Sequence, residues 1–121
     1  MIRLLWISLL IVFISGCNQG GSDAASSIPP GTTAFTVTSV KAPVSFSVNG
    51  SDNPSLTLQR GKSYTFNVNT PEHPFYLMLK PDPNAVNAYS NGVTGNGTEM
   101  GTLTFAVPAG APDKLYYNCG V

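Results

Sequence analysis

Residues 56–68 read LTLQRGKSYTFNV and contain two alternating apolar runs separated by a turn. Apolar and polar side chains alternate along residues 56–58 and again along residues 64–68. Successive side chains of a β-strand point to opposite faces, so this spacing predicts two strands that each bury one face. The intervening residues 60–62, Arg-Gly-Lys, have the composition of a tight turn.

The same pattern extends outward from this stretch in both directions. Further short alternating runs lie at residues 35–37, 44–48, 75–79, 103–107 and 115–119. Turn-forming residues separate them, and the chain shows neither a helical apolar stripe nor an internal repeat. The sequence therefore predicts an all-β protein, a β-sandwich or barrel. Residues 81–101 carry no clear strand pattern and are expected to form a functional loop or to contain a short element.

The phase of the strands predicts which side chains form the core. We expect six residues to point inward and pack two sheets together: Tyr64, Phe66, Val68, Leu103, Phe105 and Leu115.

Length and charge narrow the possible functions. The 121 residues suit one domain, and six basic side chains balance six acidic ones. Since there is no basic excess to neutralise phosphates, we expect no nucleic-acid partner.

The N-terminus has the features of an export signal. Arg3 precedes an apolar run at residues 4–14, which is too short to span a bilayer and ends in small residues before Cys17. The sequence Ile-Ser-Gly-Cys at 14–17 resembles the lipobox of bacterial lipoproteins, in which the cysteine is acylated and becomes the first residue. The alternative is an ordinary signal peptide that happens to contain a cysteine.

The lipobox resemblance divides the chain into three parts. Residues 1–16 are expected to be a lipoprotein signal peptide, residues 17–33 a flexible tether, and residues 34–121 the folded domain. The protein would then be exported and anchored by lipid to the bacterial cell envelope, at the outer membrane or its periplasmic face in a Gram-negative cell.

Few residues in the domain could carry chemistry. The carboxylates are scattered, no serine lies in a Gly-x-Ser-x-Gly setting, and no glycine-rich loop joins a strand to a helix. We therefore expect no enzymatic activity. One imidazole, His73, and one thiol, Cys119, remain. Separately, His73 could be an exposed turn residue and Cys119 an inert buried side chain. Together, imidazole and thiolate are ligands that a blue-copper site uses.

Several stretches resemble the cupredoxin-like domains, the plastocyanin-type blue-copper family. They are residues 58–66 (LQRGKSYTF), 73–76 (HPFY), 101–108 (GTLTFAVP) and 115–119 (LYYNC). The resemblance implies a Greek-key β-sandwich that binds one copper ion, with His73 as the first histidine ligand and Cys119 as the thiolate.

The chain departs from the family pattern after Cys119. In the family, a second histidine, an axial methionine and a closing strand follow the cysteine, whereas this sequence ends at Val121, and Met78 and Met100 lie in other segments. The expectation is thus an incomplete copper site in a domain cut within its copper-binding loop and lacking the closing strand.

Three functions remain open from the sequence. The first is a lipid-anchored copper protein that transfers electrons to a redox partner or handles copper. The second is a copper-free cupredoxin-like module for interaction or structure. The third is an unrelated exported β-sandwich that acts as a binding module.

Overall fold

A computed structural model describes residue 28 and residues 31–40, 45–81 and 84–120. The described residues form eight strands and one short 3₁₀ helix. In chain order these are β1 (Ala34–Val40), β2 (Ser45–Val48), β3 (Ser51–Asp52), β4 (Ser63–Asn69), β5 (Phe75–Met78), η2 (Ala85–Asn87), β6 (Val93–Thr94), β7 (Met100–Ala106) and β8 (Tyr116–Cys119). The predicted all-β class is confirmed.

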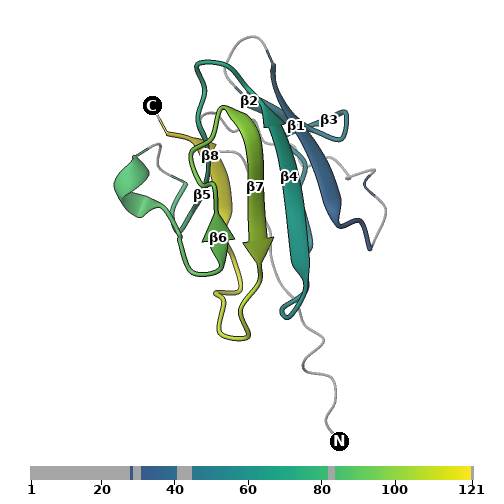
Figure 1. Cartoon of the computed structure of the whole chain (residues 1–121), viewed down its shortest axis with the longest axis vertical. Coiled ribbons are helices and arrows are strands. Elements are labelled where there is room, and N and C mark those ends of the chain that lie inside the picture. The colour runs from purple at the N-terminus through teal and green to yellow at the C-terminus, as the bar shows by residue number, and fades with distance from the viewer. Residues whose placement is uncertain (1–27, 29–30, 41–44, 82–83, 121) are drawn as a thin grey trace, which may run out of the picture.

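The strands form two sheets. Six of them make one mixed sheet in the order β3-β2-β1-β4-β7-β6, in which β1 and β4 run parallel and the other neighbours antiparallel. Strands β5 and β8 pair antiparallel in a second, small sheet. Figure 1 shows this small sheet as a layer behind the large one.

In β4 and β7 the apolar side chains lie on the inner face, as the alternating sequence predicts. Tyr64 pairs with Phe105 and Phe66 with Leu103 across the two strands, so their side chains share the inner face. All six residues expected to point inward are buried. Polar neighbours such as Asn67 lie on the outer face and are exposed.

Aromatic rings join the two sheets. Phe75 of β5 is fully buried, and its ring centroid lies 5.0 Å from that of Phe46 and 5.7 Å from that of Phe66, both in the large sheet. The Phe46 and Phe75 rings meet edge to face, a geometry that the ring quadrupoles favour. The hydrophobic core is therefore continuous from one sheet to the other.

The prediction of a strand at residues 56–58 is wrong. Leu56 and Leu58 are buried in the core while Thr57 is exposed, so the side chains do alternate. Within the described residues, however, this segment forms no ladder with a neighbouring strand. Apolar alternation reports which side chains are buried, but backbone pairing depends on what lies beside the segment.

Residues 81–101 contain three short elements: η2, β6 and the start of β7. The side chain of Asn96 fixes this region against β5. Its Oδ1 accepts a hydrogen bond from the Leu77 amide at 2.8 Å, and its Nδ2 donates to the carbonyls of Tyr89 and Leu77 at 3.0 and 3.3 Å. Backbone bonds join both ends of β5 to this region, and the Asn96 amide supplies bonds to Leu77 between them. A search for alternating apolar residues does not detect such a contact. In the part of the chain that the structure describes, no helix is long and apolar enough to cross a membrane.

Truncating a core ring should test the strand phase. Phe66→Ala removes a side chain that is 1% exposed and should lower the free energy of unfolding by about 3–5 kcal/mol. Asn67→Ala, at the exposed neighbouring position, is the control and should change it by less than about 0.5 kcal/mol. Urea denaturation measures both values. Equal midpoints for the two variants would show that the phase of β4 is misassigned.

Candidate functional site

The structure brings the two predicted metal ligands together. The Sγ of Cys119 lies 3.8 Å from the Nδ1 of His73, although the residues are 46 positions apart in the sequence. The resemblance implies that both residues bind one ion and so lie close together, and this proximity is confirmed. Their role as ligands is a separate prediction.

The register of the small sheet explains this proximity. Phe75 and Cys119 lie opposite each other on β5 and β8. Their amides point away from one another, because the Phe75 N–H donates to the Thr98 carbonyl and the Cys119 N–H to the Asn118 Oδ1. Phe75 and Cys119 are thus a non-hydrogen-bonded pair, the kind whose side chains lie closer together.

His73 reaches Cys119 from the turn that leads into β5. His73 precedes Phe75 by two residues, and its amide donates to the Thr70 carbonyl at 2.9 Å, which closes a turn over residues 70–73. On the other strand, the Gly120 amide donates to the Pro74 carbonyl at 3.1 Å. This bond continues the pairing of β5 and β8 past Cys119 and holds together the two segments that carry His73 and Cys119.

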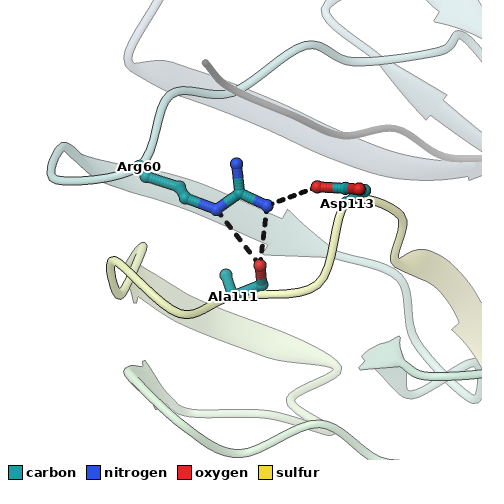
Figure 2. Close-up of polar contacts among 3 residues, drawn as sticks. All are labelled: Arg60, Ala111 and Asp113. Atoms are coloured by element: carbon teal, nitrogen blue, oxygen red, sulfur yellow. Dashed lines mark hydrogen bonds and ion pairs between the residues drawn. The ribbon is translucent and has the colours of Figure 1, made fainter. Parts of the chain in front are cut away.

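The loop that leads into β8 is anchored at the far end of the fold. Figure 2 shows Arg60, in the turn before β4, donating to the Ala111 carbonyl from Nε at 3.1 Å and from Nη2 at 2.7 Å. Nη2 also contacts the Asp113 carboxylate at 2.6 Å. Because Asp113 is exposed, the two bonds to the Ala111 carbonyl are the firmer part of this anchor.

Tyr117 holds the middle of β8. Its hydroxyl donates to the Pro54 carbonyl at 2.7 Å, and its ring packs against those of Phe46 and Phe75. Burial raises the pKa of Tyr117 well above its ordinary value of 10.0. The strand that carries Cys119 is thus fixed by an aromatic contact to each sheet and by one buried hydrogen bond.

The outer face of the small sheet carries a close aromatic contact. A Cβ atom on Gly120 would lie 2.3 Å from the ring of Tyr76, and a Cβ on Gly97 would lie 2.7 Å from it. The ring therefore rests against two glycine backbones, one of them directly after Cys119. No larger residue fits at either position unless the ring moves.

Burial limits what the pair can do chemically. Cys119 is 2% exposed and His73 is half-buried. A distance of 3.8 Å suits a thiol–imidazole hydrogen bond or two ligands of one metal ion. A catalytic nucleophile must reach a substrate carbon, and so buried a sulfur is poorly placed for that. A metal ion is smaller than a substrate and needs much less room beside the sulfur.

The other candidate ligands lie elsewhere. Within the described ranges, no group of three or more His, Cys, Asp or Glu side chains is placed to hold a metal ion. Met78 is fully buried in β5, and Met100, the first residue of β7, is 68% exposed. The predicted lipidation site, Cys17, lies outside the described residues.

Comparison of the chain with protein-family models, curated proteins and solved structures gave no match in any of the three.

The burial of the Tyr117 hydroxyl should make the free energy of unfolding depend on pH, and replacing Tyr117 should remove that dependence. In the unfolded chain the phenol ionises near pH 10.0, whereas in the folded chain it stays protonated. Above that pH the unfolded state binds fewer protons, so the free energy of unfolding falls by up to about 1.4 kcal/mol per pH unit. Tyr117→Phe removes this contribution and, at neutral pH, should cost about 1 kcal/mol for the lost hydrogen bond.

Urea denaturation of both proteins from about pH 8 to about pH 11.5 measures the difference. The difference in the free energy of unfolding between wild type and Tyr117→Phe should be constant well below pH 10.0, narrow above it, and reverse sign by about pH 11.5. A constant gap across the whole range would contradict the assigned burial of the hydroxyl.

Proposed function

We propose that this chain is an exported, lipid-anchored, cupredoxin-like protein that binds copper through the Cys119 thiolate and the His73 imidazole. The observation that carries the proposal is the 3.8 Å separation of Sγ and Nδ1. Two chemically suitable donors from distant segments meet where β5 begins and β8 ends. A lipid anchor at Cys17 and a redox protein partner belong to the same proposal, whereas nucleic acid does not.

The distance between the Cys119 sulfur and the His73 nitrogen suits the binding of one metal ion by both. Metal–sulfur and metal–nitrogen bonds of about 2.3 Å and about 2.0 Å place two ligands of a tetrahedral ion about 3.5 Å apart. The observed 3.8 Å is close to this value and needs little movement of either side chain. They also fit in chemistry, because thiolate is a soft ligand that favours Cu(I), and imidazole binds both common oxidation states of copper.

The fold supports a cupredoxin-like Greek-key sandwich. An all-β architecture of two facing sheets shares one core, and both proposed ligands lie at strand boundaries of the small sheet. The Cys119 backbone is fixed within β8, and its side chain faces Phe75. A scaffold of this kind holds its ligands in nearly constant positions.

The protein's own residues would provide three things at this site. Cys119 supplies a sulfur sheltered from water, and His73 supplies a ring nitrogen that faces it. The packed core beneath them limits movement when the charge at the site changes. Bound copper would supply one-electron redox chemistry there, which suits either electron transfer or copper handling. We propose a binding or carrier role rather than an enzyme, because the thiol is buried.

Metal titration of the purified chain tests this proposal. Under reducing conditions we expect one Cu(I) per chain, and His73→Ala and Cys119→Ser should each weaken binding by more than about 100-fold, since even indirect supports of a metal site contribute 10–100-fold. Asp113→Asn, at the opposite end of β4, should leave the affinity unchanged. Binding that survives both ligand substitutions would exclude this pair as the site.

The same titration separates the alternative functions. A wild-type chain that folds but takes up no copper at this pair would favour the copper-free module. Tight binding to a glycan array by a copper-free chain would favour an unrelated exported binding module.

Lipidation at Cys17 has its own test. Cells that express the full chain and are fed a labelled fatty acid should yield a labelled protein in the membrane fraction. Cys17→Ala should lack the label and stay unprocessed, because lipoprotein processing requires the cysteine. Stable anchoring needs two acyl chains. A Cys17→Ala protein that another peptidase cleaves would carry no acyl chain and should therefore leave the membrane fraction. An unlabelled wild-type protein would refute the anchor.

A further inference from the structure

We propose that Thr70 is a positioning residue for His73, and that the Glu99 side chain supports it by holding the turn between them. The consequence for metal binding rests on the proposed function. The positioning itself is a property of the metal-free protein and can be tested without copper.

Thr70 bonds to both backbone polar groups of His73. The His73 amide donates to the Thr70 carbonyl at 2.9 Å, and the Thr70 hydroxyl donates to the His73 carbonyl at 2.8 Å. These two bonds fix both peptide groups of the residue that carries the imidazole. The direction in which the His73 side chain leaves the backbone is thereby set before any ligand arrives.

Thr70 is itself held firmly. Its side chain is fully buried, and its amide donates to the Glu99 carbonyl at 2.7 Å. The hydroxyl also lies 3.4 Å from that carbonyl, a weaker contact than its bond to His73. Glu99 directly precedes β7, the neighbour of β4 in the large sheet. The turn is therefore attached to the rigid scaffold through Thr70.

The turn contains a residue in an unfavourable conformation. Glu72 has a φ of 70°, a region in which a side chain with a Cβ is disfavoured. Pro71 before it and the bond from His73 to Thr70 fit a type II turn, which normally carries glycine at this position. Strained residues persist where surrounding contacts impose them, and they concentrate at functional sites.

Glu99 provides such a contact. Its Oε1 accepts a hydrogen bond from the Glu72 amide at 3.0 Å. The exposed Glu99 side chain thus holds the strained residue, while the buried Thr70 holds His73. We infer that without these bonds the turn relaxes and the imidazole loses its fixed direction toward Cys119.

The test compares variants that differ in one hydrogen bond. Thr70→Val keeps the shape of the side chain but removes the hydroxyl, and Thr70→Ser restores it. Glu99→Ala removes the exposed acceptor, and Glu99→Gln retains an oxygen in its place. Tyr64→Phe is the matched control. It removes a buried hydroxyl that accepts a hydrogen bond from the Gln59 amide at 2.8 Å, and it lies near the start of β4, whereas Thr70 follows the end of that strand.

The first readout is the NMR cross-peak between the His73 imidazole Hε1 and the Cys119 β-protons in the metal-free protein. We expect it in wild type, Thr70→Ser, Glu99→Gln and Tyr64→Phe, and expect it to weaken or disappear in Thr70→Val and Glu99→Ala. The second readout is Cu(I) affinity, which should fall about 10- to 100-fold in Thr70→Val and be restored in Thr70→Ser. A merely structural role for Thr70 would move the unfolding midpoint in both Thr70→Val and Tyr64→Phe without this pattern.

The outcomes separate the two proposals. A wild-type chain that shows the cross-peak but binds no copper refutes the proposed function, and the cross-peaks of the variants still decide the role of Thr70. An undiminished cross-peak in Thr70→Val overturns the positioning role. If Thr70→Val does not fold, Thr70→Ala, which also lacks the hydroxyl, takes its place, and an undiminished cross-peak there overturns the positioning role. An undiminished cross-peak in Glu99→Ala overturns only the supporting role of Glu99.

Discussion

The candidate site depends on the placement of one aromatic ring. Phe75 is fully buried between the sheets and contacts the rings of Phe46, Phe66 and Tyr117. Its inward direction fixes the phase of β5, and its pairing with Cys119 then turns the thiol to the same side. His73 precedes the ring by two residues and so reaches the rim of the same core. The packing of the buried Phe75 ring thereby brings the Cys119 thiol and the His73 imidazole together.

Much of this arrangement could be predicted from the sequence, because it follows from local periodicity. Alternation along residues 64–68 and 103–107 identified the buried face of β4 and β7 correctly. The same reasoning put His73 and Cys119 at strand boundaries, where the two segments could meet. These predictions needed only the two-residue repeat of a strand, whereas the expectation that His73 and Cys119 meet came from the resemblance to cupredoxin-like domains.

What the sequence did not reveal depends on partners distant along the chain. Residues 56–58 alternate like a strand but lack a neighbouring ladder among the described residues. The side-chain amide of Asn96 bonds to the Leu77 backbone of β5, between two backbone bridges. Thr70 looks like an ordinary residue before proline, and only its burial and its bonds to His73 and Glu99 give it a role. Such contacts leave no periodic signal in a single sequence.

We propose above all that Cys119 and His73 bind the same metal ion. X-ray absorption at the copper edge of the Cu(I)-loaded chain tests it most directly, because the method identifies the atoms bound to the metal. We expect one sulfur and at least one imidazole nitrogen around copper, with the sulfur lost in Cys119→Ser and the imidazole signal reduced in His73→Ala. A copper environment without sulfur in the wild-type chain, or one that neither substitution changes, would contradict it.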